Sequence, residues 1–143
     1  MQCVSVPLAD TSANEETHRF VAKQDAALIY LVRAETKGSR TRIPVFIDGK
    51  ELAMTAPRTY VYLEVAPGKH TLSDVTDKER RLELDAKAGN IYFVSEEIST
   101  IDSSIHNQKV QSELVVVDDE TGKSKVNHSR MIKIQAHDGH YGS

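Results

Sequence analysis

Apolar residues recur along this chain at short intervals, either at every second position or in compact runs, and turn-forming residues separate them. Residues 58–65 alternate most clearly, with two sets of side chains on opposite faces of a predicted strand (Val61, Leu63 and Val65 against Tyr60, Tyr62 and Glu64). Residues 27–34 form a continuous apolar run rich in β-branched and aromatic residues, which predicts a strand buried on both faces.

Similar patterns predict further strands over residues 42–47, 70–77, 81–86, 90–98 and 109–117, with a short strand following Gly49. Pro44 has no backbone N–H, so the strand that contains it is expected to begin at a sheet edge. Turn signals every eight to twelve residues or so are typical of an antiparallel sandwich or barrel. The chain is therefore expected to be all-β and mainly antiparallel, a single β-sandwich of about seven to eight strands.

Three turns separate these strands, and each contains residues suited to a reversal of the chain. Asp48-Gly49 favours a two-residue hairpin, because both central residues of a type I′ turn need a positive φ. Pro67-Gly68 favours a turn because proline sets φ at the first position and glycine accepts the left-handed second one. Gly89 follows the 81–86 strand in the same way. The Asp48-Gly49 and Pro67-Gly68 turns, about twenty residues apart, together predict a β-meander.

The two ends of the chain lack this regularity. Residues 1–25 are predicted to be a flexible tether, in which residues 15–24 are either extended or a short helix capped by Asn14. Residues 26–135 form the predicted β-sandwich domain, and residues 136–143 a disordered tail. After Val117 the pattern favours a turn with one more strand at 130–135, or a short helix.

Composition excludes several classes of protein. A length of 143 residues corresponds to one domain, and a net charge of −3 gives no basic surplus for binding nucleic acid. No stretch approaches the roughly 18 apolar residues of a membrane span. Cys3 is the single cysteine, so an internal disulfide is excluded.

Motifs for catalysis and for cofactors are missing from the chain: it has no nucleophile elbow, no HExxH, no CxxC and no GxGxxG. The TGKS of residues 121–124 has the ending of a phosphate loop, but Val117 stands where its first glycine is required. Residues 118–120 are acidic without the spacing of a calcium loop, which predicts a solvated turn. No metal site, cofactor or catalytic residue is therefore assigned.

The remaining polar candidates are scattered. The six histidines are His18, His70, His106, His128, His137 and His140. We expect His70 to pack in the turn that precedes it, and Glu96 and Glu97 to form exposed ion pairs with Arg80 or Arg81. Tyr60, Tyr62 and Glu64 form a possible binding face, unless a second layer covers them.

Three blocks of sequence, in this order, resemble known families. They are Ile47-Asp48-Gly49-Lys50, then Val65-Ala66-Pro67-Gly68-Lys69-His70-Thr71-Leu72, then Ala88-Gly89-Asn90-Ile91-Tyr92-Phe93-Val94. The chain resembles PEGA-type β-domains and, over residues 26–117, a family of small bacterial envelope lipoproteins known as domain of unknown function 2846. The resemblance implies an immunoglobulin-like or PEGA-like β-sandwich and a precursor whose signal peptide ends at a lipid-modified cysteine. It supplies no catalytic residues.

Cys3 is the candidate for lipid attachment, since a soft polar segment separates it from the first strand. Only Met1 and Gln2 precede it here, and glutamine is not the small residue that a lipoprotein signal requires. Either a signal peptide is missing from this sequence, or Cys3 is an ordinary thiol. By family analogy, Val4 after the cysteine points to the outer membrane.

The expected function is that of a non-enzymatic, lipid-anchored module of the bacterial cell envelope, facing the periplasm from the outer membrane. It would bind a protein partner or cell-wall glycan, or act structurally. The alternative is a small soluble enzyme or ligand-binding β-barrel that uses the scattered His, Asp and Glu residues.

Overall fold

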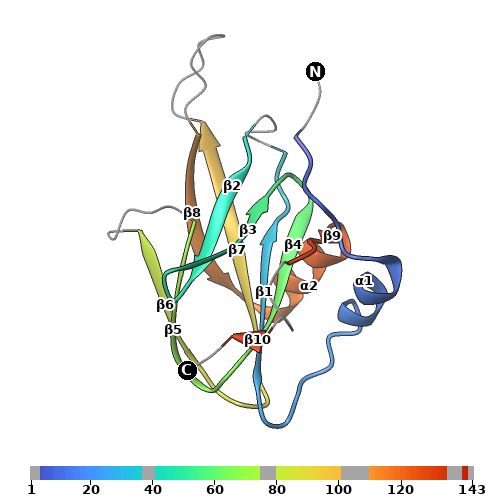
Figure 1. Cartoon of the computed structure of the whole chain (residues 1–143), viewed down its shortest axis with the longest axis vertical. Helices are drawn as coiled ribbons and strands as arrows, with labels where there is room; N and C mark the ends of the chain where they lie inside the picture. The colour runs from blue at the N-terminus through green and yellow to red at the C-terminus, as the bar shows by residue number, and fades with distance from the viewer. Residues whose placement is uncertain (1–3, 37–40, 75–79, 101–109, 135–139, 142–143) are drawn as a thin grey trace.

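The computed structural model describes residues 4–36, 41–74, 80–100, 110–134 and 140–141. Two β-sheets pack face to face, and two short helices lie against the outer face of the larger sheet (Figure 1). The larger sheet contains β1 (Ala27–Arg33), β4 (Thr59–Val65), β7 (Ile91–Thr100), β8 (Val110–Val117), β9 (Arg130–Met131) and β10 (His140–Tyr141). The smaller contains β2 (Ile43–Ile47), β3 (Lys50–Thr55), β5 (Gly68–Ser73) and β6 (Arg81–Ala86). The predicted all-β sandwich is confirmed.

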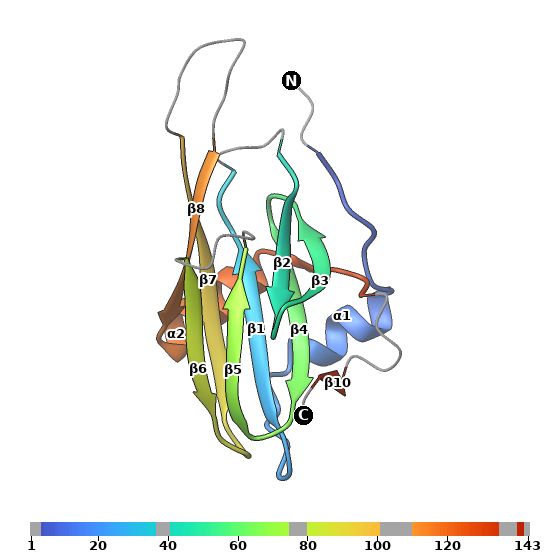
Figure 2. The ribbon, with the colours of Figure 1, turned by 60° about the vertical axis from the view of Figure 1, so that its left-hand side comes forward.

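Alternation of apolar and polar residues does not predict which strands pair with one another, and the structure shows these pairs. The larger sheet runs β10-β4-β1-β7-β8, with β9 also on β4, and the smaller runs β3-β2-β5-β6 (Figure 2). Most neighbours are antiparallel, but β1 and β7 at the centre of the larger sheet are parallel, with Leu28 opposite Ile91. Because a parallel pair needs a crossover connection, the chain forms the smaller sheet between these two strands.

Strand β1 is buried along its whole length, as its apolar run predicts. Ile29 and Leu31 point into the core between the sheets, together with Val61 and Leu63 of β4. Side chains at the intervening positions (Tyr30, Val32, Tyr60 and Phe93) belong to a second, aromatic core on the outer face of the larger sheet, which also includes Val126 of the C-terminal helix. Both faces of this sheet are therefore covered.

The two turns at the centre of the sequence differ in what they join. Asp48 and Gly49 have φ of 50° and 82°, and they connect Ile47 to its partner Lys50 in a two-residue hairpin. Gly68 has a φ of 133°, but β4 and β5 belong to different sheets. The meander prediction is therefore wrong at this point, since the Pro67 corner carries the chain from one sheet to the other.

Pro44 lies in β2, which is an inner strand of the smaller sheet. Strand β2 pairs with β3 along its whole length, whereas the described part of β5 pairs only with Phe46 and Ile47. Pro44 therefore has no partner on the β5 side among the described residues, although its strand is not at the edge of the sheet as expected.

The N-terminal segment differs from the flexible tether that its sequence predicts. Helix α1 spans Thr11–Thr17, and its N-cap is Asp10, whose carboxylate accepts the Ala13 N–H at 2.8 Å. Asn14, the expected cap, lies within the helix and accepts the Met131 N–H through Oδ1 at 2.9 Å. The segment is held against the sandwich because its polar residues bond to β9.

The C-terminal region contains both elements that were offered as alternatives. Helix α2 spans Asp119–Asn127, and Asp118 caps it by accepting the Thr121 N–H at 2.7 Å, which lowers the pKa of Asp118. The acidic residues at 118–120 therefore begin a helix. In the predicted tail, β10 pairs with Glu64 and Val65. Among the described residues, no helix is both long and apolar enough to span a bilayer.

Candidate functional site

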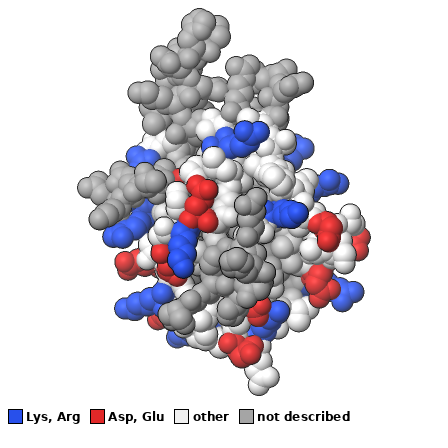
Figure 3. Space-filling view, in the orientation of Figure 1, with Lys and Arg blue, Asp and Glu red and all other residues white. Residues whose placement is uncertain are grey.

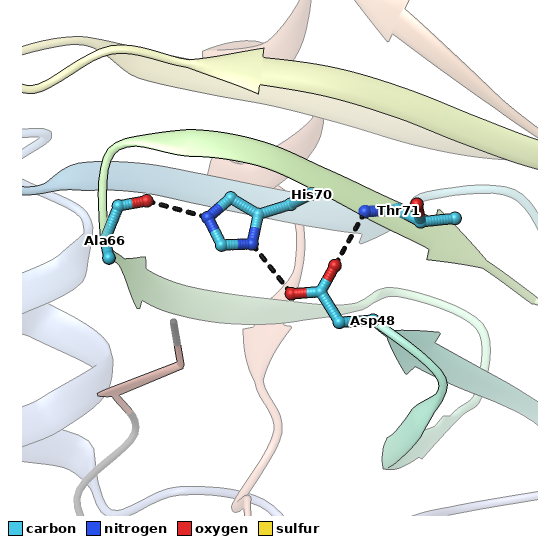
Figure 4. A network of polar contacts seen from close by, with 4 residues as sticks. All are labelled: Asp48, Ala66, His70 and Thr71. Carbon is cyan, nitrogen blue, oxygen red and sulfur yellow. Dashed lines mark hydrogen bonds and ion pairs between the residues drawn. The ribbon is translucent and has the colours of Figure 1, made fainter. Parts of the chain in front are cut away.

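Asp48 and His70 join the hairpin turn to the corner between the sheets (Figure 4). His70 Nδ1 lies 2.8 Å from Oδ2 of Asp48, and its Nε2 lies 2.7 Å from the carbonyl oxygen of Ala66. The other Asp48 oxygen accepts the Thr71 N–H at 2.9 Å. The imidazole is 4% exposed. We call this arrangement the His–Asp clasp, and its contacts agree with the packing role expected of His70.

The clasp resembles part of a catalytic triad but has no free base. In a triad the histidine uses one nitrogen to bind the carboxylate and the other to take a proton from the nucleophile. Here Nε2 must donate to the Ala66 carbonyl, so it carries a proton and cannot accept one. The ring therefore ties two turns together, and it offers no nitrogen to a substrate.

The clasp gives a prediction for Asp48. Asp48→Asn should retain most of the stability, because Oδ1 still accepts the Thr71 N–H and the amide can donate to a neutral His70 ring. Asp48→Ala loses both contacts and should lower the free energy of unfolding by about 2 kcal/mol. Urea unfolding of both variants near neutral pH measures the difference. Equal midpoints for the two would show that the hydrogen bonds contribute nothing.

The tyrosine face predicted for binding is covered in part. Tyr60 is fully buried, and its hydroxyl lies 2.5 Å from Thr17 Oγ1 of α1. Burial raises the pKa of Tyr60 to about 12. Tyr62 is half-buried, and Glu64 forms an ion pair with Lys23 at 3.4 Å. At Tyr60 a second layer therefore covers the sheet, which was the alternative to an exposed binding face.

A buried polar cluster lies between the sheets, and sequence reasoning missed it. Its members are Arg33 at the end of β1, Thr55 at the end of β3, Asp74 after β5 and Glu96 within β7, none more than 1% exposed. Arg33 Nη1 donates to the carbonyls of Thr41 and Thr55 at 2.8 and 2.9 Å. The Thr55 hydroxyl donates to Glu96 Oε1 at 2.7 Å. The expected ion pair of Glu96 with Arg80 or Arg81 is wrong, because Glu96 faces this interior cluster.

The carboxyl groups of Glu96 and Asp74 lie close enough for a proton on Glu96 to join them. Burial raises the pKa of Glu96 well above its usual range, and a hydrogen bond to Asp74 raises it further, while the nearby Arg33 charge lowers it. Glu96 Oε2 and both Asp74 oxygens receive no N–H or O–H donor from the other described residues. A proton on Glu96 therefore lets the acid pair satisfy itself.

This shared proton predicts a pH dependence of stability. A raised pKa in the folded state gives stability that is present below the unfolded value, near 4.5 for glutamate, and is lost as pH rises through the folded value. Glu96→Gln stays neutral and keeps an oxygen for Thr55, so this variant should lose less stability than the wild type as pH rises above about 5. Urea midpoints across this range measure the effect, with exposed Glu113→Gln as the control. A parallel decline in all three proteins would exclude the shared proton.

A groove of about 320 Å³ lies where the N-terminal leader, residues 4–9, crosses the sandwich. The leader is pinned by hydrogen bonds from the Ala9 N–H to the Met131 carbonyl and from the Lys133 N–H to the Pro7 carbonyl, at 2.9 and 3.0 Å. Leader residues line the groove together with residues of the β3–β4 turn and the end of α2 (Val4, Val6, Leu8, Pro57, Arg58, His128). Cys3 lies outside the described residues, directly before the leader.

A family model described as a protein of unknown function (DUF2846) matches residues 23–114. The chain belongs to this family. No curated protein and no solved structure matches it. The DUF2846 region contains the His–Asp clasp and the buried polar cluster, whereas the leader, α1 and α2 lie outside it.

The other histidines of this DUF2846 protein are dispersed. Both ring nitrogens of His18 contact carbonyl oxygens, those of Asn14 and Val126, and His128 Nδ1 contacts the Ser124 carbonyl. His106 and His137 lie outside the described residues. Within the described part of the chain, no group of three His, Cys, Asp or Glu side chains is placed to hold a metal ion.

Proposed function

We propose that this protein is a non-catalytic β-sandwich module of the bacterial envelope, held at the outer membrane by a lipid on Cys3 and facing the periplasm. There it binds a protein partner or cell-wall glycan, or acts structurally. The observation that carries this proposal is the leader, which runs from the residue after Cys3 across the sandwich and is pinned to it by backbone hydrogen bonds.

Two features support the non-catalytic part of the proposal. The His–Asp pair is occupied by the Ala66 carbonyl, and the buried acid pair has no access from the described surface, since Asp74 and Glu96 are at most 1% exposed. Both arrangements contribute to folding. The leader supports the anchored part, because a short pinned segment keeps the domain close to the bilayer.

Intact mass and membrane fractionation of the native gene product test this proposal. The expected result is a membrane-associated protein whose mass exceeds that of the polypeptide by a diacylglyceryl group and an amide-linked acyl chain. Cys3→Ser should lose the added mass and move to the soluble periplasmic fraction. An unmodified Cys3 in the native product would overturn the anchor.

A further inference from the structure

Three arginines gather around the leader from separate parts of the chain. Arg42, just before β2, donates from Nε to the Ser5 carbonyl at 2.8 Å. Arg58 of the β3–β4 turn and Arg130 of β9 line the groove, and the Arg130 N–H donates to the Arg58 carbonyl at 2.9 Å. Among the described residues that line the groove, none carries a carboxylate. In a chain with a net charge of −3, this is a local concentration of positive charge.

The face of the molecule drawn in Figure 3 agrees with this contrast. Figure 3 shows basic side chains, and no acidic ones, at the upper right of the molecule beside the N-terminal stretch, while acidic side chains appear lower on the same side. Most of the apolar lining of the groove comes from the leader, where Leu8 remains 41% exposed. The groove therefore combines a cationic rim with an apolar lining.

Arg58 lies at this rim in a strained backbone conformation. Its φ is 60°, in a turn whose third position usually takes glycine or asparagine. Hydrogen bonds hold the strained residue on both sides, from its N–H to the Arg33 carbonyl and from the Arg130 N–H to its own carbonyl. Strain of this kind is a reason to look for a function of the side chain, and the guanidinium binds phosphate oxygens in a bidentate manner.

We infer that this arginine-rimmed groove docks onto the anionic phospholipid headgroups of the membrane that holds the protein. The inference rests on the proposed anchor, because Val4 lines the groove and directly follows Cys3. One residue spans about 3.5 Å, so a lipid on Cys3 brings the groove within a Debye length, about 8 Å, of the headgroups. Arg58 and Arg130 then meet phosphates, and the exposed leader side chains meet the apolar boundary. The docked domain presents a fixed face to the periplasm.

Flotation of the unlipidated full-length Cys3→Ser chain with vesicles tests this inference without the anchor. We expect binding to phosphatidylcholine vesicles that contain phosphatidylglycerol, weaker binding in high salt, and little binding to pure phosphatidylcholine. Each basic residue near an anionic surface contributes about fivefold to partitioning, so Arg58→Asn with Arg130→Gln should lower binding about 25-fold. Asparagine tolerates the positive φ at position 58. Unchanged thermal unfolding would show that the variant is folded.

The matched control removes the same charge at the other end of β4. Lys69→Gln with Lys87→Gln lies beside the Pro67 corner and the Gly89 turn, where both lysines are exposed. This control should keep most of the vesicle binding. If the two double variants lost vesicle binding equally, docking through the groove would be overturned, because binding would then depend on net charge alone. Binding of inorganic phosphate without vesicle binding would also overturn it in favour of a soluble anion.

These results separate the groove from the anchor. Vesicle binding that depends on Arg58 and Arg130 supports docking through the groove, whether or not Cys3 is lipidated in the native protein. If the native protein is lipidated but the Cys3→Ser chain does not bind anionic vesicles, the anchor is supported and docking through the groove is overturned.

Discussion

Replacing Arg33 with methionine should lower the free energy of unfolding by about 3–5 kcal/mol, the range seen when one partner of a buried ion pair is removed. Methionine fills much of the space of the arginine stem but donates no hydrogen bond. The carbonyls of Thr41 and Thr55 would lose their donor, and the acid pair of Glu96 and Asp74 would lose the cation beside it. Equilibrium unfolding in urea measures the loss.

Two further variants show whether the loss comes from the buried charge. Arg81→Met removes an exposed arginine from β6 and should change stability by no more than about 0.5 kcal/mol. In a double-mutant cycle, Glu96→Gln should partly offset Arg33→Met, because the two residues belong to one network. If Arg33→Met were as stable as Arg81→Met, the cluster would contribute nothing to the fold.

The strands were predictable because their signals are local. Alternation in residues 58–65 places Val61 and Leu63 in the core between the sheets, and the apolar run at 27–34 becomes the fully buried β1. The Asp48-Gly49 dipeptide forms its hairpin because two adjacent positive φ values suit few other residues. Such features depend on a few neighbouring residues, which any reader of the sequence can inspect.

The partners of the strands were not predictable, and the buried cluster depends on them. Glu96 was expected to be exposed near a strand end, but β7 continues to Thr100 and runs parallel to β1, which brings Glu96 near Arg33. One signal was present in the sequence, namely a charged residue at the end of a run buried on both faces. A charge in that position requires a buried partner, but only the topology identifies it.

The elements that cover the outer face of the larger sheet were also not predictable from the sequence. The alternation that separates Tyr60 from Val61 shows which side chains share a face, but it does not show what lies over that face. In the structure α1 covers Tyr60, because Asn14 and Thr17 bond to β9 and to the tyrosine hydroxyl. The helix is too short to be stable alone, so only these tertiary contacts explain it.

Replacing Gly122 with alanine should destabilise the domain by about 3 kcal/mol or more, at the upper end of the effects of overpacking. In an ordinary helix the same change would stabilise by about 1 kcal/mol, because alanine favours the helix. Here a Cβ at residue 122 would lie 2.6 Å from Phe93 Cδ1 and closer still to Cγ and Cβ. Phe93 cannot move aside, since its ring stacks on Tyr30 at 5.2 Å and meets Phe20 edge-on at 5.7 Å.

Thermal and urea unfolding of Gly122→Ala measure this effect, and Ser124→Ala is the matched control on an exposed position of the same helix. The control should change stability by no more than about 0.5 kcal/mol. Phe93→Ala should cost about 3–5 kcal/mol alone, but less in the Gly122→Ala background, because it removes two of the clashing atoms. The glycine of the TGKS segment is therefore expected to serve close packing of α2 on β7. A Gly122→Ala protein more stable than the wild type would show that α2 does not sit this close to the sheet.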